Sequence, residues 1–437
     1  MKKAPEKKTK AAVVVTAIDG LVWQVSGVGT VVANFFRTFD QVKKQSTWFD
    51  SRDVQLIALA PDFEQSSQYV DGARREEVER ICRENNGFMD VFPSPVSPAK
   101  NEDELWAGNK DVTTLDQWRG LSLGLAAYLK SLARQFDEIL VFAHDAPFCF
   151  TRAYLSDRKV RLVWMSHGLG KLFDDKNKPN RTLAEGFGFP RFLFNGDFFA
   201  YIGEYYAETL KENYNIPGDN LLPFINEVFE TKRECRPPSP SPSHCEILQK
   251  IEGKRIILSW GRCAYQKGFD FVLPGVRAFL DQTEGQNCCA VLLMPTGTGD
   301  PAYQHKIKAV SSQLADPRLI CLFEYDEILP QILMKSVDLE VIVFGSRFEG
   351  FSLACLEALD QTGDQVRFVH SPIPPFFEVF NGVNGAVCLD DFSPEAVRKS
   401  LATCFASEPL MQARPRRSTL ASSYVLGFDR LASLTAE

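Results

Sequence analysis

Short apolar runs alternate with amphipathic segments along the first half of the chain. AAVVVTAI (11–18) and VQLIALA (54–60) are β-rich runs, and a helical stretch at 28–43 follows the first of them. LGLAAYLKSLARQF (123–136) has helical periodicity and leads into the apolar run EILVFAHD (138–145). The same pattern predicts further strands at 161–168 and 198–204 and a helix at 205–214. Strands that alternate with helices are typical of a parallel sheet covered by helices on both faces.

The pattern breaks at RPPSPSPSH (236–244), where alternating Pro and Ser exclude regular secondary structure. Proline-rich segments are stiff and extended, which suits a spacer between two domains. Beyond it the pattern predicts strands at 254–262, 288–295, 318–324, 339–345, 366–372 and 385–391. We therefore predict an α/β protein with two doubly wound domains. Its parts are a basic tail (1–10), an N-terminal domain (11–225), a Pro/Ser linker (226–253), a C-terminal domain (254–410) and a last helix (411–437).

Composition and charge narrow the class of protein. The 437 residues include 49 Lys and Arg against 56 Asp and Glu, and this net charge of −7 argues against a nucleic-acid binder. No apolar run approaches the roughly 18 residues that a membrane-spanning helix needs. The tail MKKAPEKKTK has no signal-peptide pattern, so we expect at most a peripheral membrane contact of its lysines. Eleven cysteines in apolar settings, without CxxC spacing, indicate reduced core residues of a cytoplasmic protein.

Ligands of open α/β sheets lie beyond the carboxyl ends of the strands, so residues that follow predicted strands are candidates for chemistry. FGSRFEGFSLACLEALD (344–360) places Glu349 in a loop and Glu357 on a predicted helix. In a helix their separation is just over two turns, so both carboxylates can lie on one side. The free N–H groups of 350–353 at the helix start suit an anionic phosphate. The alternative is a pair of ordinary solvated helix charges.

A second candidate loop is SWGRCAYQKGFD (259–270), directly after a predicted strand. Arg262 and Lys267 put two cations in this loop, and Gly261 and Gly268 keep its backbone thin. Two fixed cations stabilise a departing diphosphate through charge-assisted hydrogen bonds without proton transfer. The alternative is a surface loop with ordinary basic residues.

The loop after the first strand carries half of a dinucleotide-binding fingerprint. Gly27 and Gly29 match its first two glycines, but Val32 stands where the third would be. The end of the second strand, IALAPDF (57–63), is a poor match to the acidic ribose ligand that such a site needs. A nicotinamide-dependent dehydrogenase is therefore disfavoured, and a simple turn is the alternative.

Two of the five histidines end predicted strands. We predict that His144 is a buried, hydrogen-bonded residue and that His167, which precedes a glycine-rich turn, faces a ligand. No two histidines have the spacing of a metal-binding pair, so the sequence predicts no histidine metal site.

In this order the motifs resemble those of the family 4 glycosyltransferases, nucleotide-sugar-dependent enzymes of the GT-B fold. SWGRCAYQKGFDFVLPGV is similar to the family's strand–Gly-Arg–Lys-Gly–helix segment. The run from VDLEVIVFGSRFEGFSLACLEAL through FNGVNGAVCLDDFSPEAV is similar to its paired-glutamate block and Asn-Gly turn. The resemblance covers about 11–226 and 254–410. It implies two Rossmann-like domains with an interdomain cleft, and a last helix at 411–437 that crosses back to the first domain.

The resemblance implies a retaining hexosyltransferase that moves a sugar from a UDP-, GDP- or ADP-linked donor to an acceptor hydroxyl. Arg262 and Lys267 would hold the donor diphosphate in place of a metal ion, so neither a metal nor a cofactor is expected. Glu349 would support an oxocarbenium-like transition state, and Glu357 would bind the ribose hydroxyls. His167 would contact the sugar near the reacting centre. The other donor-binding positions implied are Gly27, Gly29, Gly350, Phe351, Ser352 and Leu353.

Some segments depart from the family pattern. Ser352 stands where the family usually has Gly, and the loop HSPIPPFFEV (370–379) replaces a Gly-Gly turn that ordinarily contacts the donor sugar. The Phe-rich segment at 187–200 is either a core edge or an apolar surface, which would be a wall for the acceptor or an interface.

Two alternatives to a transferase remain open. One is another GT-B enzyme, such as a sugar-nucleotide epimerase or a phosphorylase, and the other is a non-catalytic protein that binds nucleotide sugars. The pair Glu349 and Glu357 argues against the first, and retention of Arg262 and Lys267 beside them argues against the second.

Overall fold

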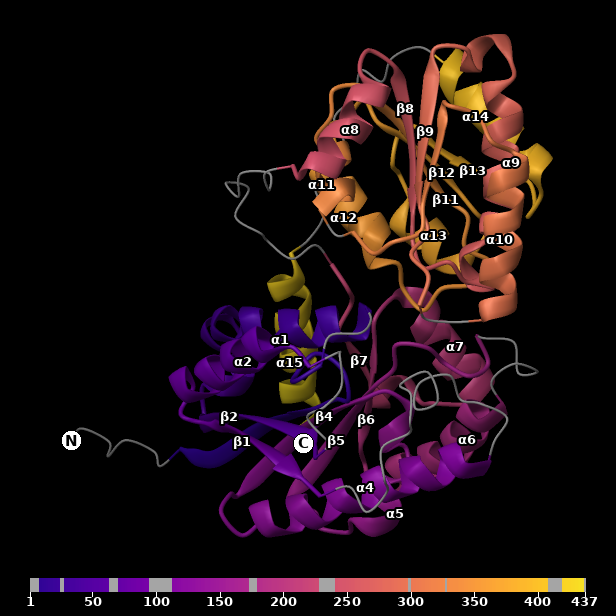
Figure 1. Ribbon diagram of the computed structural model, residues 1–437. Coiled ribbons are helices and arrows are strands. Elements are labelled where there is room, and N and C mark those ends of the chain that lie inside the picture. The colour runs from indigo at the N-terminus through magenta and orange to yellow at the C-terminus, as the bar shows by residue number, and fades with distance from the viewer. Residues whose placement is uncertain are drawn as a thin grey trace. The chain divides into compact units, whose positions relative to one another are not determined.

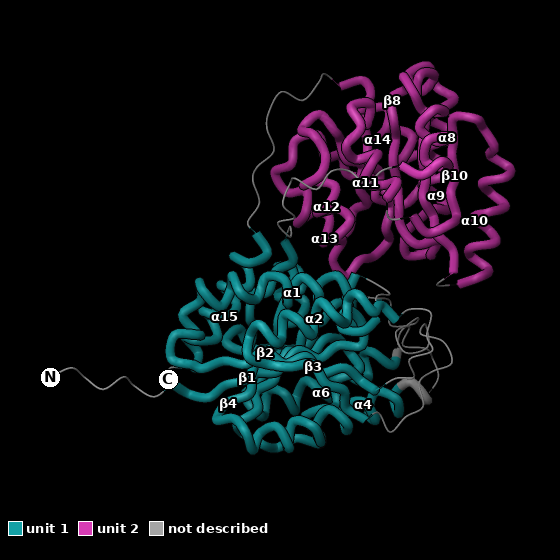
Figure 2. Tube along the Cα trace, turned by 60° about the vertical axis from the view of Figure 1, so that its left-hand side comes forward, with its two compact units in different colours: residues 1–229, 418–437 teal, residues 230–417 magenta. Residues whose placement is uncertain are grey.

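The computed structural model describes residues 8–23, 27–62, 70–93, 112–172, 179–227, 240–297, 300–326, 328–407 and 419–435. The chain divides into two compact units (Figure 2). Unit 1 comprises residues 1–229 and 418–437, and unit 2 comprises residues 230–417. Within the described ranges, no helix has the length and apolar character needed to cross a membrane.

Unit 1 is built on a seven-stranded parallel sheet in the order β3-β2-β1-β4-β5-β6-β7. Its strands are β1 (Thr9–Thr16), β2 (Arg52–Pro61), β3 (Phe88–Phe92), β4 (Glu138–His144), β5 (Val160–Met165), β6 (Phe198–Tyr201) and β7 (Leu221–Pro223). Residues 11–16 of β1 are all buried, as expected for a strand covered on both faces. The strand order reverses between β1 and β4, and ligands of open α/β sheets bind beyond the strand ends at such a point.

Helices cover both faces of this sheet. They are α1 (Gly27–Gln45), α2 (Gly72–Glu84), α4 (Val112–Leu132), α5 (Thr151–Tyr154), α6 (Pro179–Phe194), α7 (Glu204–Tyr214) and α15 (Leu420–Thr435). Figure 1 shows α1, α2 and α15 on one side of the sheet and α4, α5 and α6 on the other. The last helix completes the core of unit 1, because the Phe428 ring lies 5.5 Å from that of Phe142 and 5.6 Å from that of Phe224. Asp429 fixes the helix further by accepting a hydrogen bond from Ser46 Oγ at 2.7 Å.

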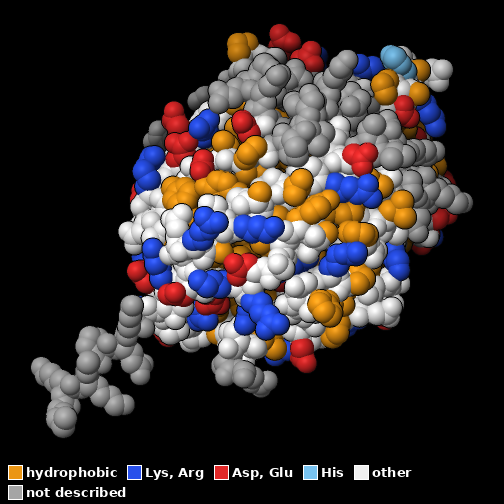
Figure 3. Space-filling view, turned by 90° about the horizontal axis from the view of Figure 1, so that it is seen from below, with side chains coloured by type: hydrophobic (Ala, Val, Ile, Leu, Met, Phe, Trp, Pro, Cys, Tyr) orange, Lys and Arg blue, Asp and Glu red, His pale blue; other side chains and the backbone are white. Residues whose placement is uncertain are grey.

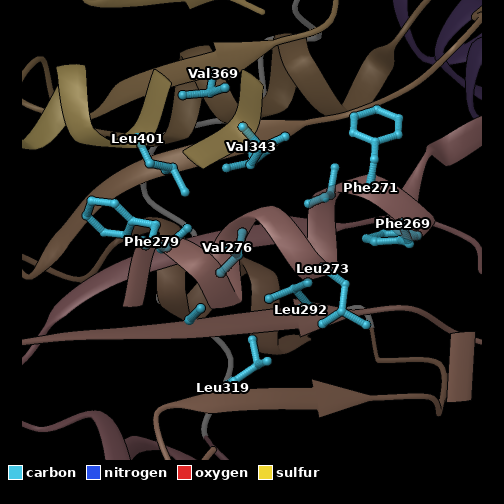
Figure 4. Packing of buried hydrophobic residues seen from close by; sticks show 14 of the residues in the cluster. Phe269, Phe271, Leu273, Val276, Phe279, Leu292, Leu319, Val343, Val369 and Leu401 are labelled. Atoms are coloured by element: carbon cyan, nitrogen blue, oxygen red, sulfur yellow. The ribbon is translucent and has the colours of Figure 1, made fainter. Parts of the chain in front are cut away.

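Unit 2 has a six-stranded parallel sheet in the order β10-β9-β8-β11-β12-β13. The strands are β8 (Arg255–Trp260), β9 (Cys288–Leu293), β10 (Leu319–Leu322), β11 (Leu339–Phe344), β12 (Arg367–His370) and β13 (Ala386–Cys388). The helices are α8 (Pro242–Ile251), α9 (Phe269–Leu280), α10 (Pro301–Gln313), α11 (Ile328–Met334), α12 (Leu353–Gln361), α13 (Pro374–Val379) and α14 (Pro394–Ala406). Side chains of α9 and α14, such as Val276 and Leu401, pack with Val343 and Leu292 of the sheet (Figure 4). The order reverses here between β8 and β11, which places the loops after these two strands side by side.

The linker prediction for 226–253 is wrong over residues 242–251, which form helix α8. Ser241 caps the helix, since its side chain accepts from His244 N while His244 Nδ1 accepts from Ser241 N. Pro242 occupies the first turn, where its missing N–H costs no hydrogen bond. Residues 241–244, the end of the Pro/Ser segment taken as a sign of irregular structure, thus start a helix. Residues 228–239 of the predicted linker lie outside the described residues.

The Phe-rich segment at 187–200 is mostly core. Phe189, Phe192 and Phe199 are buried and pack on one another, with ring centroids 4.9 Å apart for the first and last of them. Phe187 and Phe194 are exposed. The core interpretation therefore holds for the inner face of α6 and for β6, and the outer face of α6 needs a separate explanation.

Candidate active site

In unit 2 the two candidate loops meet at an ion pair. Because β8 and β11 are neighbours, the loops that follow them are adjacent, and Lys267 Nζ pairs with Glu349 Oε1. Ser346 Oγ donates to the same oxygen at 2.6 Å, and Gln266 Nε2 donates to Glu349 Oε2 at 3.3 Å. The Glu349 side chain is 8% exposed and that of Lys267 is 21% exposed. The carboxylate is thus fixed in one position, next to a cation that solvent can still reach.

A second ion pair holds the two loops together. The Arg347 guanidinium donates to Asp270 at 2.8 and 3.0 Å, and the Arg347 backbone N–H donates to the carbonyl oxygen of Gln266 at 2.7 Å. Burial alone would raise the pKa of Asp270, but hydrogen bonds and charge from Arg347 outweigh it and lower that pKa. Gly268 has φ +69°, and a Cβ there would lie 2.1 Å from the Gly345 carbonyl oxygen, so only glycine permits this contact. No sequence pattern singled out this clamp, although Arg347 stands two residues before Glu349.

The two glutamates do not share a helix, so the helical-spacing argument for them is wrong. Helix α12 begins at Leu353, and Glu349 lies in the loop before it. Its position comes from the contacts with Lys267 and Ser346 instead. Glu357 lies on α12, and its side chain is exposed to solvent. Protein atoms surround its carboxyl group on the other sides, and the resulting desolvation raises its pKa to about 7.

The start of α12 has free hydrogen-bond donors. In the described part of the chain, none of the backbone N–H groups of residues 350–353 has a hydrogen-bond acceptor. Ser352 is the N-cap, but its side chain makes no capping bond and instead accepts from Cys355 Sγ. Arg262 is exposed, and its guanidinium forms no hydrogen bond or ion pair with the residues described. Unit 2 therefore offers several donors and cations that could bind a diphosphate, although Arg262 and Glu357 form no hydrogen bond with the Lys267–Glu349 pair.

In unit 1, the predicted glycine-rich loop packs against an acidic residue, Asp19, that no sequence motif singled out. Asp19 is buried, and its Oδ2 accepts a hydrogen bond from Gly29 N at 3.1 Å near the start of α1. A Cβ at Gly29 would lie 2.3 Å from Asp19 Oδ1. Gly29 therefore makes room first for this carboxylate, which neutralises the positive end of the helix. Gly27, the first residue of α1, is exposed, and a role of either glycine toward a donor stays a prediction.

His144 and His167 form a hydrogen-bonded pair at the carboxyl ends of β4 and β5. His144 Nδ1 and His167 Nε2 are 2.9 Å apart, so one ring nitrogen donates to the other. Burial, followed by the nearby His167, lowers the pKa of His144 well below its usual value. Burial also lowers the pKa of His167 to about 4, although Asp145 opposes this shift. Both rings are thus neutral near pH 7, and His167 can contact a ligand by hydrogen bonding but not by charge. The prediction of a buried, hydrogen-bonded His144 agrees with this geometry.

A buried network from α6 fixes the loop that carries His167. Arg181 donates to both oxygens of Asp145, at 2.5 and 3.1 Å, and to the carbonyl oxygen of Gly168. Glu185, one turn further along α6, accepts from Gly170 N at 3.1 and 2.9 Å and from Tyr214 Oη. Burial raises the pKa of Glu185 to about 8, against the opposing charge of Arg181. This network was not predicted from the sequence, because nothing in the local spacing links α6 to β4.

Other metal- or thiol-based sites find little support in the described residues. They contain no cluster of three or more His, Cys, Asp or Glu side chains that could hold a metal ion. The ten cysteines described are free thiols, and seven of them are buried.

No protein-family model matches the sequence, and no curated protein matches it either. Solved structures similar to the chain include an E. coli trehalose-6-phosphate structure bound with UDP-2-fluoro glucose (14% identity, TM-score 0.63, 97% of this chain and 95% of that one). Another is an alpha,alpha-trehalose-phosphate synthase (UDP-forming) from Burkholderia xenovorans in complex with glucose-6-phosphate (13% identity, TM-score 0.63, covering 98% of this chain and 96% of that one). A third is a sucrose-phosphate synthase from Thermosynechococcus elongatus (11% identity, TM-score 0.62, covering 98% of this chain and 94% of that one).

These similarities are similarities of fold. The two parallel sheets of seven and six strands form a GT-B-like architecture, as in trehalose-6-phosphate synthase structures. The predicted fold class is therefore confirmed. The likeness is to GT-B glycosyltransferases as a class, and membership of family 4 stays a prediction.

Proposed function

We propose that the chain is a retaining glycosyltransferase of the family 4 type, which moves a hexose from a nucleotide sugar to an acceptor hydroxyl without a metal ion. The observation that carries the proposal is the Lys267–Glu349 ion pair at the carboxyl ends of β8 and β11, beside the unbonded N–H groups of 350–353. The GT-B-like fold supports it. UDP-linked glucose is the first donor to test, and a sugar phosphate the first acceptor, because similar structures hold such ligands.

In the proposed reaction, Arg262, Lys267 and the N–H groups of 350–353 bind the donor diphosphate. The bond between the anomeric carbon and the phosphate oxygen breaks, and the cations stabilise the charge that develops on the leaving diphosphate. The acceptor oxygen bonds to the same carbon from the same face, and its proton passes to the departing phosphate oxygen. Arg262 and Lys267 do the work for which other transferases use a metal ion.

The remaining residues act on the sugar and the nucleoside. Glu349 supports the positive charge that develops on the sugar ring, and its contacts with Lys267 and Ser346 keep the carboxylate in place before the donor binds. Glu357 accepts hydrogen bonds from the ribose hydroxyls. His167 contacts the sugar as a neutral hydrogen-bonding group, since its pKa of about 4 leaves it uncharged near pH 7.

The direct test is turnover. We expect the full chain to release a nucleoside diphosphate from UDP-, GDP- or ADP-glucose when glucose 6-phosphate or another hydroxyl acceptor is present. The rate should not change when EDTA is added. If no donor yields a nucleoside diphosphate, even by slow hydrolysis, the transferase proposal fails.

Replacing Lys267 by Ala is expected to weaken binding of the nucleoside diphosphate by about 10–100-fold, the value of one charge-assisted hydrogen bond. Isothermal titration calorimetry measures the effect. Lys399→Ala is the matched control, because Lys399 is an exposed lysine of the same unit that pairs with the exposed Asp390. Equal affinity of the parent and the Lys267→Ala chain would remove Lys267 from the diphosphate site.

A second candidate, binding of nucleotide sugars without transfer, is favoured by one observation. Residues 374–379, where the family has a Gly-Gly turn that contacts the donor sugar, form helix α13, with Phe376 buried and Phe377 exposed. Tight binding of a donor by the parent chain, with no turnover for any acceptor, would support this function instead.

A further inference from the structure

The outer face of α6 exposes large apolar side chains along its length. Leu183, Phe187 and Phe194 are 61%, 38% and 91% exposed, and their spacing places them on one side of the helix. Leu123 on α4 is 45% exposed. These four are most of the large hydrophobic residues exposed in the described part of unit 1; the others are Val91 and Leu426.

Ring contacts join the exposed faces of α4 and α6 into one surface. The Arg119 guanidinium of α4 lies 5.5 Å from the Phe150 ring, and the Phe150 ring lies 5.1 Å from that of Phe187 on α6. The Arg191 guanidinium covers the other side of Phe187 at 3.6 Å. We call this the α4–α6 surface. Its residues are Arg119, Leu123, Lys130, Arg134, Leu183, Phe187, Arg191 and Phe194.

The α4–α6 surface is basic, although the whole chain carries a net charge of −7. Lys130 is exposed on the same side of α4 as Leu123, and Arg134, two residues beyond the end of α4, is exposed as well. Neither forms an ion pair with the residues described. The only acidic residue of α6 is Glu185, which is buried, and the only one of α4 is Asp116, which pairs with Arg119 at 2.9 Å. Figure 3, which looks onto this side of unit 1, shows apolar and basic side chains interspersed, with few acidic ones.

We propose that the α4–α6 surface binds the anionic face of a phospholipid bilayer. Protruding apolar side chains enter the region between headgroups and acyl chains, while Lys and Arg beside them attract anionic headgroups. A second copy of the chain is a poor occupant, because a symmetric contact would set these cations against one another. Nucleic acid would use the cations but would leave Leu183 and Phe194 in water.

This binding is independent of sugar transfer, yet it involves a helix of the candidate site. The buried face of α6 carries Arg181 and Glu185, which fix the loop of His167. A bilayer on the outer face of α6 thus contacts the helix that positions this loop.

The test is flotation of the full chain with vesicles of phosphatidylcholine alone or of an equimolar mixture with phosphatidylglycerol, at about 0.1 M salt. We expect the mixed vesicles to bind the chain at least about tenfold more strongly. Phe194→Ser should reduce binding by about tenfold or more. The double variant Lys130→Gln/Arg134→Gln should reduce it by about 25-fold, since each charge contributes about fivefold.

Val337→Ser and Lys399→Gln are matched controls, because both residues are exposed in unit 2, and they should bind vesicles like the parent chain. Equal binding to both kinds of vesicle, or unchanged binding by the α4–α6 variants, would overturn the proposal. So would a dimer that Phe194→Ser dissociates in the absence of lipid binding. Binding of an oligonucleotide but not of vesicles, lost in the Lys130→Gln/Arg134→Gln chain, would assign the surface to nucleic acid.

Discussion

Replacing Glu349 by Gln is expected to lower the kcat for sugar transfer by about 10²–10³-fold, the usual effect of removing one preorganised electrostatic group from an active site. The amide keeps the size of the side chain and can still accept from Ser346 Oγ, so the loop after β11 should keep its shape. What it lacks is the negative charge that supports the sugar ring in the transition state. Initial rates of nucleoside diphosphate release, at saturating donor and acceptor, measure the loss.

The same variant should bind the nucleoside diphosphate at least as tightly as the parent chain does. Without the carboxylate, Lys267 loses its ion pair and its full charge becomes available to phosphate. A drop in kcat without a rise in Kd therefore separates a transition-state role from simple misfolding. Glu395→Gln, at an exposed carboxylate of the same unit, is the control and should change neither quantity. A Glu349→Gln chain with kcat within threefold of the parent value contradicts the assigned role.

The fold could be predicted from the sequence wherever a strand is buried on both faces. The apolar run at 138–145 became β4 (Glu138–His144), and the run at 339–345 became β11 (Leu339–Phe344). Such strands are almost wholly apolar because helices cover both sides, so periodicity alone locates them. Since parallel strands need helical crossovers, their order also predicted the doubly wound class.

The hydrophobic pattern did not predict β3 (Phe88–Phe92) and β7 (Leu221–Pro223), the two edge strands of the sheet in unit 1. Four of the five residues of β3 are partly or fully exposed, and β7 has only three residues. An edge strand pairs on one side only and needs no continuous apolar run, so its sequence looks like a loop.

The candidate site could be predicted loop by loop but not as a whole. Arg262, Lys267 and Glu349 each follow a predicted strand, and the rule that ligands bind at strand ends was enough to single them out. Their contacts were not predictable, because Lys267 and Glu349 are 82 residues apart and meet only through the adjacency of β8 and β11. The partner of Asp145 was hidden for the same reason: Arg181 is 36 residues away along the chain, on α6.

Breaking the buried ion pair between Asp145 and Arg181 is expected to have the largest effect on stability. Asp145→Asn is expected to lower the free energy of unfolding by about 3–5 kcal/mol, because it leaves Arg181 buried and charged without a counter-ion. Both side chains are at most 5% exposed, so water cannot replace the lost partner. Asp145 has φ 74° and ψ 178°, a strained conformation for any residue with a side chain, and Asn has nearly the same size and shape as Asp, so the substitution itself adds no backbone strain. Urea unfolding of the parent and variant chains gives the difference.

The effect should depend on pH with a definite sign. Burial alone would raise the pKa of Asp145, but the charge and hydrogen bonds of Arg181 outweigh it and lower that pKa below its usual value. The pair therefore stabilises the fold fully above about pH 4, the pKa of an unfolded Asp, and the contribution is lost as the pH falls through the lower folded pKa. The difference between the parent and Asp145→Asn chains should accordingly shrink in acid.

Two further variants test whether the missing counter-ion is the cause. Asp145→Asn/Arg181→Met removes both charges and should recover much of the loss, since the penalty comes mainly from the unpaired arginine. Asp390→Asn breaks an exposed pair with Lys399 and should change stability by no more than about 1 kcal/mol. If the double variant is no more stable than Asp145→Asn alone, the ion pair does not explain the loss. The strained turn at Asp145, and with it the position of His167, would then depend on the aspartate itself.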